Sequence, residues 1–198
     1  MKKILLIGTG GTIASKQMGG GLTPGMEAQE ILEYVPEMGK ICEMDVLQLC
    51  NIDSTNMEPE VWTKLVLAIK ENYDKYEGFV VLHGTDTMAY TSAALSYMVQ
   101  NSRKPIVITG AQQPIDTDGT DAKVNLRDSI IYACDDYSEN VVLVFDGNVI
   151  AGTRAKKMRA RSFNAFHSVN FPVLARIQDS RIIMNLSELT IIQNLPEN

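Results

Sequence analysis

Histidine and cysteine are scarce in this chain of 198 residues, which contains two histidines and three cysteines. Because only His83 and His167 are available, a histidine-rich metal site or a Ser-His-Asp triad is poorly supplied. The cysteines, Cys42, Cys50 and Cys134, are odd in number and match no zinc-binding spacing. We therefore expect no metal centre, and we interpret the thiols as buried or incidental residues.

The chain also lacks an excess of positive charge and any long apolar run. A net charge of -6 gives no reason to expect nucleic acid or an anionic membrane surface as a partner. No stretch approaches the ~20 apolar residues of a membrane span. The apolar run at residues 4–7 is shorter than the roughly 7–15 residues of a signal-peptide core, and glycines follow it. The sequence therefore predicts a cytoplasmic protein without a nucleic-acid or membrane partner.

Short apolar runs alternate with helical patterns along most of the chain. A hydrophobic fraction of 45% is enough to supply a sizeable core. The predicted strands cover residues 4–7, 44–49, 79–82, 105–109 and 141–145, and the predicted helices cover residues 27–34, 59–73, 87–100 and 121–134. This alternation predicts an α/β domain, a mostly parallel sheet flanked by helices on both faces.

The C-terminal part of the chain follows a different pattern. The Asp-Gly-Asn turn at residues 146–148 predicts a hairpin into a strand at 149–150. Residues 173–177 and 181–184 then predict a C-terminal β-hairpin region. The mixed polar and apolar segment 186–198 predicts the start of a linker. We therefore expect one α/β domain over residues 1–185 and a linker that leads to a further domain absent from this chain.

Two of the predicted strands are each followed closely by a threonine. Residues 4–7 run into Gly-Thr-Gly-Gly-Thr, which ends at Thr12, and residues 79–82 run into His-Gly-Thr-Asp-Thr, which contains Thr85 and Asp86. Ligands of open α/β sheets bind beyond the carboxyl ends of the strands. The first segment lacks both the third glycine of a dinucleotide loop and a Walker lysine. Two hydroxyls, one beside a carboxylate, therefore indicate nucleophilic chemistry rather than phosphate binding.

The same residues also permit purely structural interpretations, which the sequence leaves open. Segment 8–12 fits a tight turn in which Thr12 is only a cap, and Asp86 fits the N-cap of the following helix. The polar segment 51–57 fits a solvated turn, and the basic run 152–161 fits a solvated surface. A lysine of that run, packed in a cleft, could instead provide the base that a threonine nucleophile needs.

Together these segments resemble the bacterial-type L-asparaginase family of amidohydrolases over essentially the whole chain. The resemblance rests on ordered motifs at residues 10–14, 53–55, 83–88, 109–114 and 162–166. It implies an N-terminal catalytic domain that hydrolyses L-asparagine to aspartate and ammonia, without a cofactor, in a homo-oligomer of the cytoplasmic, type I branch. The alternatives are a glutaminase, an amidase-type subunit of a tRNA amidotransferase, and a catalytically impaired domain that binds an amino acid or dimerises.

The resemblance also implies roles for individual residues. Thr12 matches the nucleophile that forms an acyl-enzyme ester, and Thr85, Lys157 and Asp86 match the second threonine, its lysine and its aspartate. Asp86 would also hold the substrate ammonium, and backbone amides near Gly11 and Thr85 would form the oxyanion hole. Lys157 is preferred to its neighbour Lys156 because it keeps the family's spacing after the preceding glycine. The further residues implied in substrate binding are Asp53, Ser54, Thr55, Gly11, Gly84 and Ala111.

Two features depart from the family's pattern. The family places a tyrosine on the mobile loop after the first motif, whereas this loop, residues 15–24, has Leu22 there and contains no tyrosine. Its glycine run at 19–21 predicts a lid that is disordered without ligand. The family also has a smaller C-terminal domain that completes the active site of a neighbouring subunit. Without it, this chain is expected to hydrolyse asparagine slowly.

Overall fold

A computed structural model describes residues 1–18 and 21–185 of the chain. Most of the predicted glycine lid at 19–21 and the whole predicted linker at 186–198 lie outside the described residues. None of the helices within the described ranges combines the length and the apolar character needed to cross a membrane.

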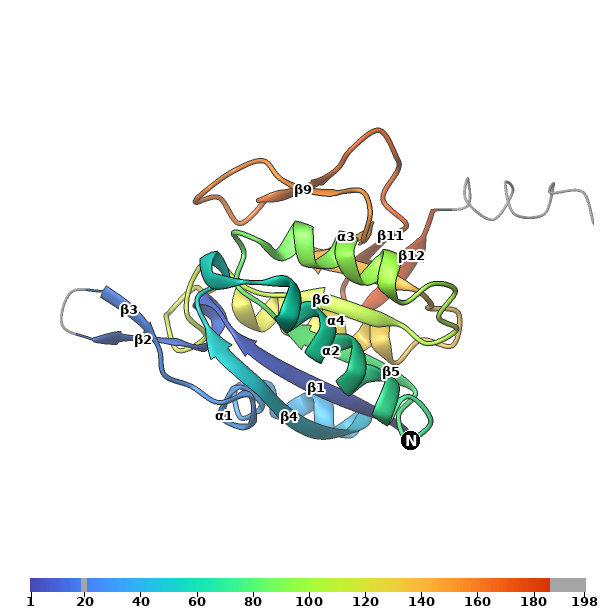
Figure 1. The fold of residues 1–198 in the computed structure, drawn as a ribbon, viewed down its shortest axis with the longest axis horizontal. Coiled ribbons are helices and arrows are strands. Elements are labelled where there is room, and N and C mark those ends of the chain that lie inside the picture. Colours follow the sequence, from blue (N-terminus) through green and yellow to red (C-terminus); the bar gives the residue numbers. More distant parts are fainter. Residues whose placement is uncertain (19–20, 186–198) are drawn as a thin grey trace, which may run out of the picture.

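Strands and helices alternate through the first three quarters of the chain (Figure 1). The strands are β1 (Lys2–Gly10), β2 (Ser15–Met18), β3 (Gly21–Pro24), β4 (Cys42–Ile52), β5 (Gly78–Leu82), β6 (Ile106–Thr109), β7 (Val141–Phe145), β8 (Asn148–Ala151), β9 (Ala155–Lys157), β10 (Phe166–Ser168), β11 (Ala175–Gln178) and β12 (Arg181–Met184). The α-helices are α1 (Ala28–Leu32), α2 (Pro59–Asn72), α3 (Met88–Met98) and α4 (Ala122–Ala133), and the 3₁₀ helices are η1 (Thr12–Ala14), η2 (Pro36–Lys40) and η3 (Ser54–Asn56). Each predicted strand and helix is present. The strands at 141–145 and 181–184 have the predicted ends, and the other elements have shifted ends. The hairpins β2–β3 and β9–β10 were not predicted.

One sheet of eight strands organises the domain, in the order β12-β11-β8-β7-β6-β5-β1-β4. The strands from β4 to β7 in this order pair in parallel, and β8, β11 and β12 extend the sheet in antiparallel fashion. The predicted mostly parallel sheet and the C-terminal β-hairpin region are therefore confirmed. From β1 the chain goes first to β4 on one side and then to β5 on the other. The carboxyl ends of β1 and β5 thus form the topological switch point, where ligands bind in such sheets.

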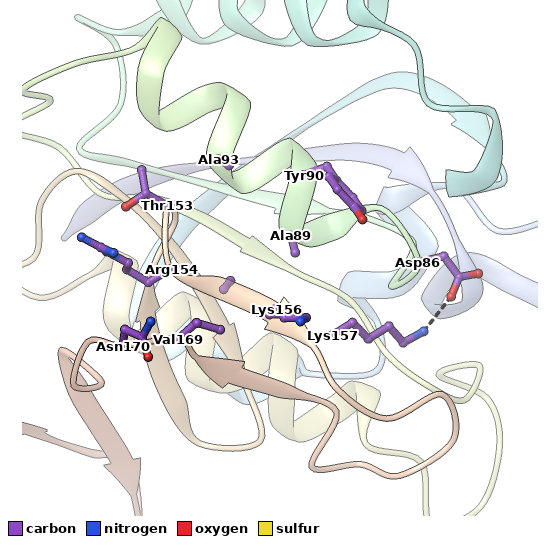
Figure 2. A pocket seen from close by; sticks show the side chains of 11 residues that line it. Asp86, Ala89, Tyr90, Ala93, Thr153, Arg154, Lys156, Lys157, Val169 and Asn170 are labelled. Atoms are coloured by element: carbon purple, nitrogen blue, oxygen red, sulfur yellow. Dashed lines mark hydrogen bonds and ion pairs between the residues drawn. The ribbon is translucent and has the colours of Figure 1, made fainter.

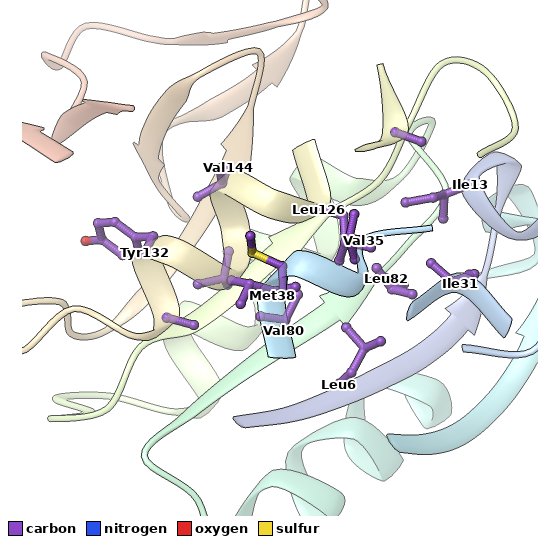
Figure 3. Packing of buried hydrophobic residues seen from close by; sticks show 14 of the residues in the cluster. Leu6, Ile13, Ile31, Val35, Met38, Val80, Leu82, Leu126, Tyr132 and Val144 are labelled. Atoms are coloured by element: carbon purple, nitrogen blue, oxygen red, sulfur yellow. The ribbon is translucent and has the colours of Figure 1, made fainter. Parts of the chain in front are cut away.

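Both faces of the sheet are covered, because successive residues of a strand point to opposite faces. On one face, Leu6 and Val80 pack in a buried cluster with Ile31 and with Leu126 of α4 (Figure 3). On the other face, strand residues such as Val81 pack against α2 and α3. Helices on both faces, predicted from the alternation, are thus confirmed. Burial of both faces fixes the strand register and leaves the carboxyl edge free for a site.

The helix between β6 and β7 gives this sheet an unusual connection. The crossovers through α3 and α4 advance in the same direction across the sheet, yet α3 and α4 lie on opposite faces. The α3 and α4 crossovers therefore have opposite handedness. The crossovers through α1 and α2 have the same handedness as the α3 crossover. Since about 98% of such crossovers are right-handed, the α4 crossover is the left-handed one. It leads the segment after β6 toward η1, where Ile115 N–H donates to the Ile13 carbonyl at 3.4 Å.

Two glycines let the carboxyl ends of β1 and β5 touch. Gly11 has a φ of 85°, which side-chain-bearing residues rarely adopt. A Cβ built on Gly11 would lie 2.3 Å from the Gly84 nitrogen, and a Cβ built on Gly84 would lie 2.6 Å from the Ser54 Cβ. No heavy atoms can remain at those distances. The backbone contact between the two strand ends therefore requires glycine at position 11, and glycine at position 84 leaves room for Ser54 beside that contact.

A chain of buried hydrogen bonds fixes the end of β5. His83, at 0% exposure, lies 2.7 Å from the Gly84 carbonyl through Nδ1 and 2.9 Å from the Thr91 hydroxyl through Nε2. Because a carbonyl only accepts, Nδ1 carries the hydrogen and Nε2 accepts from Thr91. Trp62 Nε1 in turn donates to Thr91 Oγ1 at 2.9 Å. These hydrogen bonds thus connect α2 and α3 to the Gly84 peptide through a neutral imidazole.

This neutral imidazole predicts a stability that depends on pH. Burial lowers the pKa of His83 from 6.5 to about 4, against a smaller raising effect of the Gly84 carbonyl. Between these values the unfolded chain binds the proton more readily, so stability is complete above pH ~6.5 and falls as pH decreases toward ~4. The contribution is about 3 kcal/mol. We expect urea unfolding of His83→Gln, compared with the parent at each pH, to show a smaller loss of stability across this range.

Asp128 on α4 provides a control, because its contribution to stability changes with pH in the opposite direction. Burial raises its pKa to about 6, with a smaller opposing effect of Arg127. The folded protein therefore binds a proton more readily than the unfolded chain between about pH 4 and 6, and this contribution is lost as pH rises. Asp128→Asn should accordingly steepen the acid loss that His83→Gln flattens. Parallel pH profiles for the parent and His83→Gln would contradict the assignment of a buried neutral His83.

Candidate active site

Side chains predicted for the site follow four neighbouring parallel strands. Thr12 comes after β1, Asp53 after β4, Thr85 and Asp86 after β5, and Ala111 after β6. Because parallel strands end at the same edge, the sheet brings these positions together although they lie far apart in the sequence. The glycine contact between β1 and β5 stands at the centre of this edge.

A cavity of about 120 Å³ opens at the glycine contact. It is lined by Gly11, Thr12, Ser15, Asp53, Ser54, Gly84, Thr85 and Asp86. Every lining residue except Ser15 was predicted for the site. Its volume is well below the ~300–1,000 Å³ of pockets for drug-sized ligands, so it suits a ligand of few heavy atoms.

Lys157 completes one side of the site from a separate element. It ends β9, which pairs with β10, and its side chain reaches toward the start of α3 (Figure 2). Its Nζ donates to Thr85 Oγ1 at 2.8 Å and to Asp86 Oδ1 at 2.7 Å. The Lys157 side chain is only 17% exposed, whereas that of Asp86 is 61% exposed. The amine of Lys157, and not that of Lys156, is thus held in contact with a hydroxyl group that lines the cavity.

Asp86 does not act as the cap of the helix that follows it. The N-cap of α3 is Thr87, and no side chain makes a capping hydrogen bond there. The carboxylate of Asp86 instead pairs with Lys157. The capping interpretation of Asp86 is therefore wrong, because the β9–β10 hairpin supplies a cation that the local sequence does not contain.

The segment after β4 combines a structural and a potential binding role. Asp53 Oδ1 accepts from both the amide and the hydroxyl of Thr55, each at 2.8 Å, and so caps η3. These two donors lower the pKa of the Asp53 carboxyl. Ser54 is buried and lines the cavity, whereas Thr55 is exposed and its hydroxyl is engaged by Asp53. The turn interpretation of segment 51–57 thus describes the contact between Asp53 and Thr55. Asp53 and Ser54 line the cavity, whereas Thr55 does not.

Gln112 contacts the site from the segment after β6. Its Oε1 lies 3.2 Å from Thr85 Oγ1, and its Nε2 lies 3.1 Å from the Ser162 carbonyl and 3.2 Å from the Ala160 carbonyl. Its neighbour Ala111 is fully buried in the core, so a contribution of Ala111 to binding would come from its backbone.

A second, larger cavity adjoins the Lys157–Asp86 pair. Its volume is about 600 Å³, and Figure 2 shows it between α3 and the β9–β10 hairpin. Ala89 and Tyr90 line it from the helix, and Lys156 lines it from the strand. No group of three or more His, Cys, Asp or Glu side chains suited to a metal ion occurs within the described ranges.

Ser15 and Gln112 are the contacts that inspection of the sequence missed. Ser15 lines the small cavity and donates to the Gly11 carbonyl at 3.0 Å. It belongs to a segment predicted as a mobile loop, so no signal distinguished it. Gln112 did carry a signal, since it follows the carboxyl end of a predicted buried strand, as Thr85 does.

Comparison with known proteins finds relatives over nearly the whole chain. A family model described as Asparaginase, N-terminal, matches residues 3–189. The L-asparaginase of Thermococcus kodakarensis is 37% identical over 186 residues, which cover 92% of this chain and 56% of that protein. Its solved structure superposes with a TM-score of 0.86 at 35% identity, and also covers 92% of this chain and 56% of that one.

A second kind of relative matches almost as well. The glutamyl-tRNA(Gln) amidotransferase of Metallosphaera sedula has one subunit that is 36% identical over 185 residues, covering 88% of this chain and 42% of that protein. The chain thus spans about half the length of the curated relatives it matches. The family match covers nearly all residues of this chain. The chain therefore belongs to the asparaginase family, of which it carries the part that the N-terminal model describes.

Proposed function

We propose that this chain carries the amide-hydrolysing site of an L-asparaginase, which converts asparagine to aspartate and ammonia through an ester on Thr12. The observation that carries the proposal is the contact of Lys157 with Thr85 and Asp86 beside a cavity that Thr12 lines. The family match and the names of its L-asparaginase relatives support it.

The first half-reaction forms the ester. Thr12 Oγ attacks the side-chain carbonyl carbon of asparagine, and a C–O bond forms. Free threonine hydroxyls are weak nucleophiles, so the attack needs a base. In the proposed relay, the Thr12 proton passes to Thr85 Oγ while Thr85 passes its own proton to a neutral Lys157 Nζ. The protonated Lys157 then returns this proton through Thr85 to the leaving nitrogen as the C–N bond breaks, and ammonia departs.

The second half-reaction repeats the relay with water. Water attacks the ester carbonyl while its proton enters the same path through Thr85 to Lys157. The C–O bond to Thr12 breaks, the Thr12 oxygen regains a proton, and aspartate is released. Each half-reaction thus uses the same two hydroxyls and the same amine, and consumes no cofactor.

Backbone amides at the glycine contact would stabilise the developing negative charge on the carbonyl oxygen. The amide of Gly11 donates to the Ile52 carbonyl at 3.1 Å and is therefore engaged by the fold. We assign the oxyanion contact to the amides that follow the two glycines, those of Thr12 and Thr85. Both residues line the cavity, which fits this assignment.

The α-ammonium group of the substrate would meet a charge of opposite sign, and the α-carboxylate would meet a hydroxyl group. The Asp86 carboxylate shares only Oδ1 with Lys157, which leaves Oδ2 for the α-ammonium group. Ser54 faces the cavity and would bind the α-carboxylate, with Asp53 beside it. Thr55 would join this contact only after its hydroxyl leaves Asp53. Ala111, next to Gln112, would contribute through its backbone.

The second candidate is hydrolysis of a glutamine-type amide, as in the tRNA amidotransferase subunits named among the relatives. The proposed chemistry is the same, and only the length of the substrate side chain differs. We further propose that a C-terminal domain outside this chain closes the site within a cytoplasmic homo-oligomer, and that the isolated chain is consequently slow. Ammonia release from asparagine, glutamine and buffer alone separates the two substrates and an inactive binding domain.

The first test removes the nucleophile. Thr12→Ala takes away the attacking oxygen and little buried volume, so we expect a folded protein whose ammonia release from asparagine falls by at least about 10³-fold. Thr117→Ala, an exposed threonine outside the cavity, is the matched control and should keep the parent rate. Turnover of folded Thr12→Ala within a few-fold of the Thr117→Ala rate would contradict the proposal.

The second test removes the amine. Lys157→Met keeps an apolar stem of similar length, and we expect kcat to fall by about 10²–10⁴-fold, the usual effect of losing a positioned base. Lys156→Met changes the neighbouring lysine, which does not contact Thr85 in the described structure, and should keep kcat. The opposite pattern, with Lys156→Met inactive and Lys157→Met active, would show that the base is assigned to the wrong lysine.

A further inference from the structure

Among the described residues, two side chains contact the Thr85 hydroxyl, those of Lys157 and Gln112. Building on the proposed function, we propose that Gln112 is a positioning residue for the reaction. It holds Thr85 Oγ in the orientation in which that oxygen relays a proton between Thr12 and Lys157.

The surroundings of Gln112 decide which end of its amide faces Thr85. The other end lies among three backbone carbonyls, those of Arg159, Ala160 and Ser162, at 3.5, 3.2 and 3.1 Å. Carbonyl oxygens only accept hydrogen bonds, so the NH₂ group must point at them. The carbonyl oxygen of Gln112 is thereby directed at Thr85. The loop between β9 and β10 thus sets the polarity of a contact inside the site.

This polarity determines how the Thr85 hydroxyl is used. A hydroxyl has one hydrogen and two acceptor lone pairs. In the described arrangement Lys157 donates to one lone pair, and the hydrogen goes to Gln112 Oε1. In the proposed relay this hydrogen turns about the Cβ–Oγ bond from Gln112 to the neutral Lys157 Nζ, while Oγ stays where Gln112 has placed it. The second lone pair stays open for the proton of the attacking Thr12 hydroxyl. A reversed amide would donate to that lone pair and block the relay.

The backbone of Gln112 is itself held rigidly. Its N–H donates to both carboxylate oxygens of Asp121, at 3.1 and 2.9 Å, and the Gln113 N–H donates to the same carboxylate at 3.1 Å. Asp121 is 8% exposed and also accepts from Asn125 Nδ2 at 3.2 Å. The start of α4 therefore anchors Gln112, and the side chain has a fixed base from which to hold Thr85.

The orientation of Thr85 can be measured without turnover. Three-bond scalar couplings of the ¹³C-labelled Thr85 methyl group report its χ1 angle, and we expect values of a single rotamer in the parent. Gln112→Met keeps the side-chain length but removes the acceptor, so the couplings should move to rotamer-averaged values. We expect kcat to fall about tenfold with KM within about twofold, since one hydrogen bond to the relay is lost.

Three companion variants sharpen the test. Gln113→Met makes the same change one residue away, at a side chain with no hydrogen bond among the described residues, and should keep the parent couplings. Gln112→Glu keeps an acceptor oxygen but turns a second one toward the Arg159, Ala160 and Ser162 carbonyls, so it should average the couplings as Gln112→Met does. Parent couplings in Gln112→Glu would show that the donor end of the amide does not direct the acceptor at Thr85. Gln112→Asn has a side chain one methylene shorter and should average the couplings as Gln112→Met does. If Gln112→Met does not fold, Gln112→Asn takes its place in the test.

The outcomes separate the two proposals. Parent-like couplings in folded Gln112→Met or Gln112→Asn would overturn the positioning role. If Thr12→Ala and Lys157→Met retain turnover while Gln112→Met averages the couplings, the proposed reaction is wrong and the contact that orients Thr85 remains.

Discussion

The backbone contact between Gly11 and Gly84 is the constraint on which the rest of the site depends. A Cβ on either glycine would overlap neighbouring atoms, at 2.3 Å for Gly11 and 2.6 Å for Gly84. Because Gly11 lacks a side chain, β1 and β5 can end against each other, and because Gly84 lacks one, Ser54 can pack beside them, with a threonine following each glycine. The site is therefore a property of two strand ends, and the buried His83 chain and the apolar faces of the sheet serve to keep those ends in register.

Elements far apart in sequence then converge on this contact. The β9–β10 hairpin brings Lys157 over the carboxyl edge, 72 positions along the chain from Thr85. The left-handed crossover places the start of α4 where Asp121 can hold the backbone of Gln112. Gln112 in turn bridges Thr85 to the hairpin loop through the Ala160 and Ser162 carbonyls. One hydroxyl is thus connected to three separate parts of the fold, which supports the proposal that its orientation matters.

Much of this arrangement is accessible from the sequence, because buried parallel strands and polar strand ends have distinct local patterns. Thr12, Thr85 and Asp86 could be identified in this way, and the family resemblance added Lys157. The hairpin that carries Lys157 could not, since its basic run lacks the alternation of a strand and is stabilised by distant contacts. The hand of the α4 crossover and the contacts of Gln112 depend on tertiary packing, which local pattern does not encode.

The most direct test of this account is a single methyl group at the glycine contact. Gly84 does not have a positive φ, so Gly84→Ala adds steric bulk without backbone strain, and the added Cβ must displace the Ser54 side chain or the Gly11 backbone. Gly39→Ala, whose Cβ would meet nothing within 4 Å, is the matched control. We predict that Gly84→Ala folds but loses about 100-fold or more in kcat/KM for asparagine, as expected when reacting groups shift by about 1 Å, while Gly39→Ala keeps the parent value. A folded Gly84→Ala with kcat/KM within twofold of Gly39→Ala would contradict the central role of the glycine contact.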